Sequence, residues 1–236
     1  MHKFVIILAF LLPVGITFSQ KDTTFYEEVI IQRNRLDIPI NQATRNVEVL
    51  TAKEIKKLPA RTVNEVLAYV GGVDIRQRGP FGTQADISID GGSFEQTLVL
   101  INGVKLLDAQ TAHNMMNMPI PLDAIERIEV LRGPAARVYG INALTGAINI
   151  VTKKSKEAYF TVNSYAGSSF ESKEQGDGDG IYGGGGLQLS GNFATKNQQH
   201  LITLSQDSYN GQRYNTASNN TRVFYAGEHK LNKKNA

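Results

Sequence analysis

The sequence predicts an α+β domain followed by the first strands of an antiparallel transmembrane β-barrel, and three observations lead to this fold class. The N-terminus has the pattern of an export signal. Residues 45–153 combine short amphipathic stretches with apolar strands that glycine and proline separate. Residues 154–236 instead alternate apolar and polar side chains over strands of roughly 8 to 10 residues, and no helical pattern covers their apolar face.

The composition is that of a folded chain and does not predict nucleic-acid binding. The 236 residues suffice for one or two domains, and contents of 20% charged and 41% apolar residues do not suggest disorder. The formal net charge is +3, but the lysines and arginines are scattered and form no basic stripe interleaved with aromatic residues. Cysteine is absent, so the exported chain has to be held by packing, oligomerisation or a membrane rather than by disulfides.

Residues 1–19 have the features of a cleaved signal peptide. Lys3 supplies a positive charge, an apolar run follows over residues 4–12, and Thr17 and Ser19 are small residues at the spacing that a signal peptidase reads. The apolar run is shorter than the about 20 residues that a membrane-spanning helix needs. We therefore expect export and removal of this segment rather than a membrane anchor.

Residues 20–44 are predicted to be a polar linker that contains one β-prone stretch. This stretch is either the first strand of a domain or an exposed strand that pairs with the sheet edge of a partner, and the residues alone leave both interpretations open. Its last five residues are Glu28, Val29, Ile30, Ile31 and Gln32.

The α+β domain is expected to open with a strand and two short helices. Residues 46–50 alternate as in a strand. Thr51 and Thr62 are each followed by a glutamate at the spacing of a capping box, so a helix is expected after each of them. A further strand is predicted over residues 86–89. A hairpin is predicted over residues 98–106, because Asn-Gly lies at the position that a type I′ turn favours.

Two long polar connections interrupt the domain, over residues 76–84 and 108–119. Loops of this length usually carry function or are mobile. Every methionine except the initiator lies in the second loop, beside His113. Thioether and imidazole groups can bind Cu(I), but methionine also forms adaptable packing and ligand surfaces, and the second interpretation is favoured. No metal site is therefore predicted.

Residues 126–153 place charges, chain breaks and an apolar strand close together. Four charged residues alternate with apolar ones, and glycine and proline then interrupt the run before the apolar strand of residues 147–151. We interpret the first part as a strand with its charges on one face and its apolar side chains packed inside the domain. The charged residues are Glu126, Arg127, Glu129 and Arg132.

The connections in residues 154–236 also alternate between long and tight. Residues 168–184 and 207–221 are long and glycine-rich or polar, whereas residues 196–198 form a tight turn. Short turns on one side and long loops on the other are typical of a transmembrane β-barrel, although a soluble sandwich also fits four strands. Because barrel diameter grows with strand number, four strands cannot enclose the preceding domain of about a hundred residues, and we expect the barrel to be incomplete.

Three blocks of the α+β domain resemble one protein family. Residues 86–92, 98–104 and 126–153 are similar, in this order, to the plug-domain signature of TonB-dependent outer-membrane receptors. An ordered set of blocks is far more specific than a lone short motif. Asp90 is a departure, because in many relatives the Ser-Ile dipeptide is followed by arginine.

The resemblance implies a globular plug seated inside a wide barrel. The charges at Glu126, Arg127, Glu129 and Arg132 would then face a polar barrel lumen and seat the plug. The stretch from Glu28 to Gln32 lies where the family carries its TonB box, so the partner expected there is TonB with its inner-membrane energising complex. The other expected partners are outer-membrane lipid and a small-molecule ligand.

The function that the resemblance implies is energised uptake of a scarce ligand such as an iron-siderophore, haem or cobalamin across the cell outer membrane. Residues 92–98 and 110–114 look loosely like cobalamin-receptor-type members. Both long loops interrupt the core on the side expected to face out, and polar groups beside an aromatic suit a bulky amphiphilic ligand. The expected ligand contacts are Arg76, Arg78, Phe81 and Gln84 in the first loop and His113, Asn114 and Met115 in the second.

No catalytic constellation or cofactor site is predicted. Residues 178–183 satisfy a dinucleotide-binding fingerprint literally, but no βαβ unit surrounds them. Ser93 follows two glycines without the Gly-x-Ser-x-Gly elbow of a hydrolase. The alternative to a receptor is a secreted, non-transporting binding or adhesion module whose sheet continues as a soluble β-sandwich.

Overall fold

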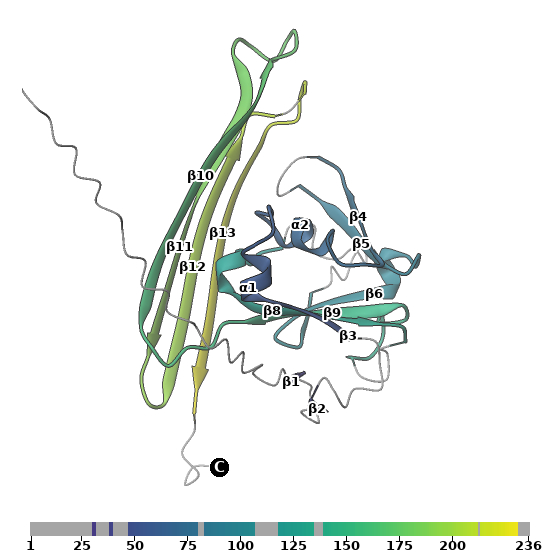
Figure 1. The fold of residues 1–236 in the computed structure, drawn as a ribbon, viewed down its shortest axis with the longest axis vertical. Coiled ribbons are helices and arrows are strands. Elements are labelled where there is room, and N and C mark those ends of the chain that lie inside the picture. Colours follow the sequence, from purple (N-terminus) through teal and green to yellow (C-terminus); the bar gives the residue numbers. More distant parts are fainter. Residues whose placement is uncertain are drawn as a thin grey trace, which may run out of the picture.

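An α+β domain lies against a tall wall of four long strands in the computed structural model (Figure 1). The predicted signal peptide, residues 1–19, falls outside the described part of the chain. Among the described residues, no helix combines the length and the apolar character needed to cross a membrane. The structure describes residues 30–31, 38–39, 47–79, 83–106, 118–134, 139–211 and 213–230.

A five-stranded sheet forms the centre of the α+β domain. Its strands are β3 (Val47–Thr51), β6 (Thr97–Ile101), β7 (Val104–Leu106), β8 (Ile125–Arg132) and β9 (Gly146–Thr152). Their order is β3-β8-β9-β6-β7, and all neighbours are antiparallel except β6 and β9. The predicted turn is confirmed, because Asn102 and Gly103 have φ values of 49° and 79°, both positive as a type I′ turn requires.

Apolar side chains pack on both faces of this sheet. Ile128 and Val130 point into the larger cluster, which the helices also join, while Leu131 and Ala147 belong to a smaller cluster. Alternate residues of a strand point to opposite faces, so β8 contributes to both clusters. A sheet that is buried on both sides reads as nearly continuous apolar runs, as residues 146–152 do.

Two short helices follow β3, as predicted. α1 (Ala52–Ile55) begins at a complete capping box, in which Thr51 and the Glu54 side chain bond each other's backbone N–H groups. α2 (Val63–Leu67) begins at Thr62, whose hydroxyl accepts a hydrogen bond from Glu65 N at 3.3 Å. The second predicted capping box is wrong in one half, because the Glu65 carboxylate accepts from Arg61 N at 2.7 Å instead.

A hairpin of β4 (Val73–Gln77) and β5 (Ala85–Ile89) follows α2. Two 3-10 helices, η2 (Phe94–Gln96) and η3 (Leu122–Ala124), precede β6 and β8. The predicted loop of residues 76–84 is therefore wrong at its start, because β4 continues through Gln77 by pairing with Ala85. The apolar alternation of β4 ends at Ile75, so the sequence gives no apolar signal that the strand continues through Arg76 and Gln77.

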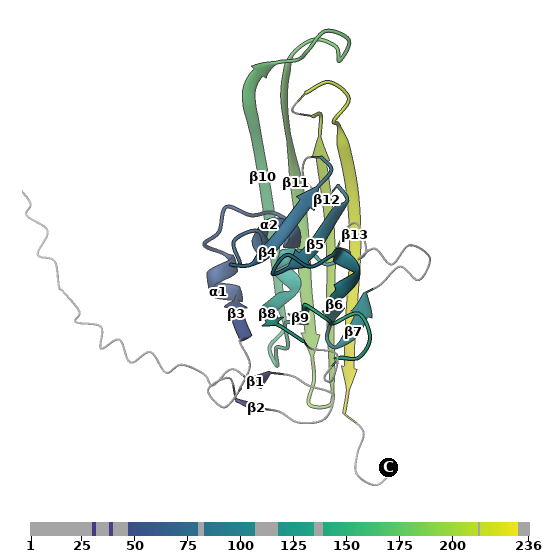
Figure 2. The same ribbon diagram turned by 90° about the vertical axis from the view of Figure 1, so that its right-hand side faces the viewer.

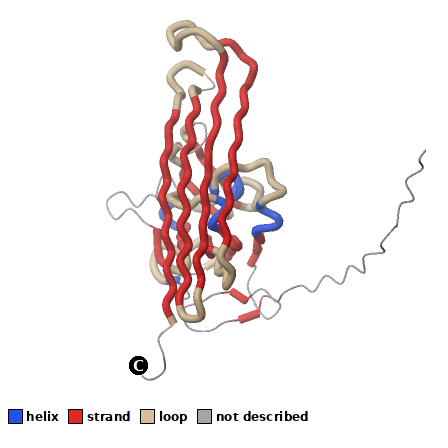
Figure 3. The backbone as a smooth tube through the Cα atoms, turned by 90° about the vertical axis from the view of Figure 1, so that its left-hand side faces the viewer, coloured by secondary structure: helices blue, strands red, loops and turns tan. Residues whose placement is uncertain are grey.

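The wall consists of four consecutive antiparallel strands, 12 to 14 residues long (Figure 3). A short turn at residues 195–197 lies at one end and the longer connections lie at the other, as predicted. The predicted strand lengths are too short, because the ladders continue from the apolar stretch into polar residues. The strands are β10 (Tyr159–Ser172), β11 (Ile181–Ala194), β12 (Gln198–Tyr209) and β13 (Ser218–His229).

A separate two-stranded ladder joins β1 (Ile30–Ile31) to β2 (Ile38–Pro39) in antiparallel pairing. Figures 1 and 2 place this ladder below the five-stranded sheet, toward the end of the wall that carries the short turn. The β4–β5 hairpin rises toward the opposite end, where the long connections lie (Figure 2). The two predicted functional regions thus lie at opposite ends of the domain.

Candidate functional site

The β4–β5 hairpin carries the first predicted ligand loop. The Arg76 Nε and the Asp74 carboxylate are 3.0 Å apart, and the Arg78 guanidinium lies 3.7 Å from the Asp86 carboxylate. Both arginine side chains are largely exposed. Each carries a positive charge that one hairpin carboxylate partly balances, and both remain accessible to a solute at this end of the domain.

Gln84 closes the same hairpin. Its backbone O accepts a hydrogen bond from Arg78 N at 2.9 Å, and its side-chain Nε2 is buried without a hydrogen-bond partner among the described residues. The structure therefore brings Arg76, Arg78 and Gln84 together on one hairpin. Ligand contact by these residues stays a prediction. Phe81, His113, Asn114 and Met115 lie outside the described residues.

The charged strand β8 contains a buried ion pair. Arg127 and Glu129 are only 8% and 2% exposed, and Arg127 Nε donates to Glu129 Oε1 at 2.9 Å. Asn149 Nδ2 from β9 donates to the other oxygen of the Glu129 carboxylate at 3.0 Å. Arg127 also donates to Glu126 at 2.7 Å. These bonds satisfy the buried carboxylate within the domain, as a buried charge requires.

The expectation that all four charges of β8 share one face is wrong. Arg132 has the same parity as Ile128 and Val130, which point into the larger apolar cluster, whereas Arg127 and Glu129 point to the opposite face. Glu126 lies at a register shift between Ile125 and Arg127, so strand parity does not assign it to a face. The alternation of charged and apolar residues is irregular here, so charge pattern alone does not reveal the two faces. Whether these residues seat the plug stays a prediction.

Asp90, the departure from the family pattern, has a partner inside the domain. Its carboxylate lies 3.9 Å from the Arg132 guanidinium, and its backbone N donates to Gly72 O at 2.8 Å. Gly72 has a φ of 73°, and a Cβ there would lie 2.1 Å from an Arg132 nitrogen. Glycine at this position therefore allows Arg132 to reach across to Asp90.

The predicted partner-binding stretch is only partly described. Ile30 pairs with Pro39, and Ile31 pairs with Ile38, in the short ladder of β1 and β2. Because the described ladder has two strands, β1 has a second edge at which a further strand can add. Glu28, Val29 and Gln32 lie outside the described residues, so their role stays a prediction.

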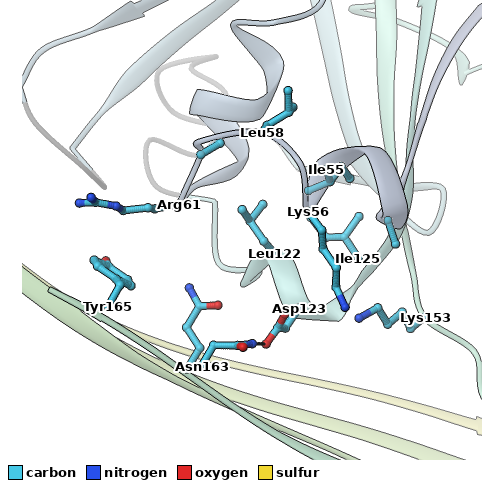
Figure 4. A pocket seen from close by; sticks show the side chains of 13 residues that line it. Ile55, Lys56, Leu58, Arg61, Leu122, Asp123, Ile125, Lys153, Asn163 and Tyr165 are labelled. Atoms are coloured by element: carbon cyan, nitrogen blue, oxygen red, sulfur yellow. Dashed lines mark hydrogen bonds between the residues drawn. The ribbon is translucent and has the colours of Figure 1, made fainter. Parts of the chain in front are cut away.

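The α+β domain contacts the wall through an aromatic and ionic network that the sequence analysis did not find. The Arg61 guanidinium lies 4.6 Å from the centre of the Tyr165 ring (Figure 4). The Tyr165 hydroxyl donates to Asp207, and Asp207 also accepts from Arg222 on β13. The network thus links α2 to β10, β12 and β13. The only sequence signal for it is that Tyr165, Asp207 and Arg222 occupy polar positions of the alternating pattern.

Glycines in β11 make room for this network. Gly186 pairs with both Tyr165 and Asp207 in the ladder, and a Cβ there would lie 2.5 Å from Asp207 Oδ1 and 2.7 Å from the Tyr165 ring. Residues 183–186 are all glycine, and the predicted loop of residues 168–184 included the first two of them. Their position inside β11 shows that they serve close packing rather than a turn.

Further contacts fix the domain to the wall at its other edge. Asn163 on β10 donates to Asp123 in η3. Lys154, which follows β9, forms an ion pair of 2.8 Å with Glu228 on β13. Leu201 of β12 is buried in the larger apolar cluster of the domain, so the contact is apolar as well as polar.

Comparison with known sequences identifies related proteins. A family model described as TonB-dependent Receptor Plug Domain matches residues 39–147. The chain is 30% identical over 185 residues to a protein of Vibrio vulnificus (strain CMCP6) named vitamin B12 transporter BtuB, a match that covers 78% of this chain and 30% of the relative. The chain thus spans about a third of the length of the curated relatives it matches.

Comparison with solved structures gives the same architecture. The siderophore receptor PirA from Pseudomonas aeruginosa superposes with a TM-score of 0.59 at 26% identity, covering 81% of this chain and 32% of that chain. The ferric citrate transporter FecA, in its unliganded form, gives a TM-score of 0.68 over 81% of this chain and 29% of its own. At 18% identity the likeness to FecA shows the fold alone.

The comparisons and the observed fold agree on one family. The matched residues contain four strands of the five-stranded sheet, the first residues of the fifth strand β9, both helices and the β4–β5 hairpin. The superpositions extend over more of the chain than the matched residues. The named relatives are transporters and receptors rather than enzymes. The chain therefore belongs to the TonB-dependent receptors, with a plug domain followed by the first strands of a β-barrel.

Proposed function

We propose that the chain is part of an outer-membrane receptor that takes up a small-molecule ligand with energy supplied through TonB. The observation that carries this proposal is the contact between the plug and the polar inner face of a wall whose outer face is apolar. A plug in that position blocks the lumen of a barrel, so uptake requires the plug to change or move. The alternative of a secreted module with a soluble sandwich is not favoured, since it gives no reason for an uncovered apolar face.

The outer face of the wall fits a lipid environment. Its large apolar side chains are exposed, while inward residues of β11 and β12 such as Ser190, Thr203 and Ser205 are buried. Outward apolar and inward polar alternation is the pattern of an outer-membrane barrel. The exposed residues of this face are Phe160, Val162, Leu187, Phe193, Ile202, Leu204, Val223 and Tyr225.

Coupling to TonB is assigned to the strand that contains Ile30 and Ile31. β-augmentation takes most of its affinity from backbone N–H and C=O groups, and β1 has an edge at which a strand of TonB can add. The ladder lies toward the short-turn end of the wall, and short turns face the periplasm in such barrels. TonB would therefore meet this strand from the periplasmic side.

Cobalamin is our first candidate for the ligand, with iron chelates second. The similar curated sequences are named vitamin B12 transporters, whereas the similar structures are receptors for siderophores or ferric citrate. The candidate contacts Arg76, Arg78 and Gln84 supply polar groups at the end of the plug where the long loops lie. Binding of radiolabelled cyanocobalamin and of a ferric siderophore to cells that produce the full-length receptor distinguishes the two ligands.

The coupling test uses Ile30→Pro in the full-length receptor, with Val29→Ala as the matched control. Proline removes a backbone donor and fixes φ, whereas alanine keeps every backbone hydrogen bond. We expect Ile30→Pro to retain ligand binding and its level in the outer membrane but to lose energised uptake, and Val29→Ala to retain all three. Full uptake by Ile30→Pro contradicts the assignment, and loss of the protein from the membrane shows that the strand is structural.

The ligand site is tested with Arg78→Ala and Phe81→Ala. Both should weaken binding of the native ligand without changing barrel assembly, because the Arg78 side chain is largely exposed and Phe81 belongs to the same predicted ligand loop. Assembly is measured by heat-modifiable migration in gels, and binding by the retention of labelled ligand on whole cells. Unchanged affinity in both variants would remove these residues from the site.

A further inference from the structure

A cavity of about 360 Å³ lies between the plug and the wall, away from the β4–β5 hairpin (Figure 4). Its plug side is formed by α1, the chain that follows it, η3 and the start of β8, and its wall side by β10 and β11. A volume of this size lies within the range of small-molecule sites. Among the described residues, neither the predicted ligand loops nor the predicted TonB-binding stretch contributes a residue to it.

Two lysine side chains converge at one end of the cavity. Figure 4 shows the Lys56 and Lys153 ammonium groups turned toward each other near Asp123. Burial is the main reason that the pKa of Lys153 is lowered; the Asp123 carboxylate raises this pKa, and the Lys56 charge lowers it further. The two ammonium groups are therefore close enough to repel each other, and that of Lys153 is partly desolvated.

The single carboxylate at this end does not balance both lysines. Asp123 accepts a hydrogen bond from Asn163 of the wall, which already occupies part of its capacity. Within the described residues, no ion pair joins Asp123 to Lys56 or Lys153 at contact distance. Two positive charges against one negative charge leave this end of the cavity with a net attraction for an anion.

The backbone at this end is fixed from both sides. Lys153 N donates to Ala124 O at 2.8 Å, and Lys153 O accepts from the Gln199 side chain of β12 at 3.3 Å. Lys56 N is held by the last turn of α1. The two ammonium groups thus start from positions that the plug and the wall define, which lowers the entropy lost when they hold a ligand.

The rest of the cavity is mostly apolar. Ile55, Leu58 and Leu122 line its plug side, and Gln188 of β11 adds a side-chain amide on the wall side. A bare inorganic ion would leave these apolar side chains uncovered, whereas a short carbon chain would pack against them. The lining therefore suits a molecule with carboxylate groups and a hydrocarbon segment.

We propose that this cavity is a binding site for a small organic anion, with one carboxylate held by Lys56 and Lys153 and its carbon chain against Leu58 and Leu122. The inference rests on the proposed function, because in a working receptor the cavity lies between plug and barrel, beside the path that a solute takes past the plug. The wall residues that line the cavity carry no charge, so an anion bound there forms ion pairs with the plug alone. It neutralises two plug lysines that otherwise repel each other.

The test is lysine acylation of the full-length receptor in detergent, read residue by residue by mass spectrometry, with succinate as the probe. Acylation needs the neutral amine, and a carboxylate that holds an ammonium group keeps it charged. We expect millimolar succinate to slow acylation of Lys56 and Lys153 several-fold. Lys57, which is exposed like its neighbour Lys56 but does not line the cavity, should react at an unchanged rate.

Two matched controls make the test specific. Succinamide has the same carbon chain without the charges, so it should protect neither lysine. Lys153→Gln should abolish the protection of Lys56, whereas Lys57→Gln should leave it intact. Equal protection by succinamide, equal protection of Lys57, or no protection of Lys56 and Lys153 at saturating succinate would overturn the proposal.

The outcome is separable from the test of the proposed function. Acylation is measured without TonB and without transport, so a receptor that takes up its ligand but shows no succinate protection contradicts only the anion site. A receptor that shows the protection but takes up no ligand contradicts only the proposed function. Heat-modifiable migration of each variant in gels confirms that the barrel is intact in either case.

Discussion

The plug sheet and the barrel wall use the same backbone ladder with opposite burial. In the plug, apolar residues are buried on both faces of the sheet. In β12 of the wall, Thr203 and Ser205 are 1% and 0% exposed, while their neighbours Ile202 and Leu204 are 47% and 41% exposed. The contrast shows that burial alone does not identify a core. Exposed apolar side chains are favourable on the wall, where the outer face of a barrel contacts lipid, but not on the plug.

The buried carboxylate of β8 and two buried hydroxyls of β12 differ in how completely they are hydrogen-bonded. The Glu129 carboxylate in the plug accepts two hydrogen bonds, from Arg127 and Asn149. The hydroxyls of Thr203 and Ser205 on the wall are buried and have no hydrogen-bond partner among the described residues. Each buried hydroxyl without a partner costs desolvation free energy that no hydrogen bond offsets, so this part of the contact between plug and wall is weakened. A plug that separates from the wall before it unfolds is consistent with this difference.

The largest expected effect comes from breaking the plug core alone. Ile128 is fully buried in β8, and Ile128→Ala should destabilise the plug by roughly 2–5 kcal/mol, since it removes buried methylenes and leaves a cavity. Denaturant unfolding of the plug, followed by protease susceptibility, measures the change. Val104→Ala, at an exposed position of β7, is the control and should have little effect. Equal effects of the two changes would show that the sheet is not the core of the plug.

The outer face of the wall is tested with a charge. Val223 pairs with Leu204 in the middle of the outward apolar rows, so Val223→Arg should destabilise the folded barrel by about 2–4 kcal/mol in a bilayer. Thr221→Arg lies on the same face two residues nearer the polar end and should cost only about 0–1 kcal/mol. Folding equilibria of the full-length receptor in lipid vesicles measure both. A larger destabilisation by Thr221→Arg than by Val223→Arg would show that the centre of the bilayer does not lie at the level of Val223.

The inner face of the wall is tested by filling the space beside Gly186, between the Tyr165 ring and the Asp207 carboxylate. Gly186→Ala should destabilise the receptor by roughly 1–3 kcal/mol, because the added Cβ overlaps the Tyr165 ring and the Asp207 carboxylate. Gly191→Ala, in the same strand, is the matched control, since its Cβ would meet nothing closer than 3.7 Å. Thermal unfolding of the two variants gives the comparison. Equal stability of the two variants would mean that the contact between Arg61 and Tyr165 does not depend on the absence of a side chain at Gly186.

The smallest effect concerns the capping box of α1. Hydrogen bonds from the Thr51 backbone and then from its side chain hold the pKa of Glu54 below its ordinary value. A lowered folded-state pKa gives stability that is present above the pKa of the unfolded chain and is lost as the pH falls through the folded-state pKa. Glu54→Gln should therefore remove a small part of the acid sensitivity of plug unfolding. Thr51→Ala should cost about 1 kcal/mol at neutral pH.

A comparison of unfolding curves between neutral and acidic pH measures this difference. The Glu54→Gln and wild-type curves should approach each other on acidification, because the wild-type carboxylate is then protonated. A constant difference across the pH range would show that the Glu54 charge does not contribute to the cap.

Local sequence patterns predicted much of the plug because they report local physics. The Asn102–Gly103 turn follows from the positive φ values that this pair tolerates, and the helix after Thr51 follows from a capping box that spans four residues. The end of β4 and the partner of the Glu65 carboxylate were missed, because a ladder with β5 and a bond to Arg61 N outweigh the local pattern there. The ligand loops and the coupling strand stay predictions.

The sequence by itself determined the family, the order of the elements and the alternation of the wall, since these depend on residue spacing along the chain. Only the tertiary structure decided where charges go. It paired Arg127 with Glu129, and it placed Arg61 over Tyr165 across more than a hundred residues of chain. It also brought Lys56 and Lys153 to one cavity. Electrostatic partners are chosen by distance in space and by desolvation, and neither quantity is encoded in the spacing of residues along a strand.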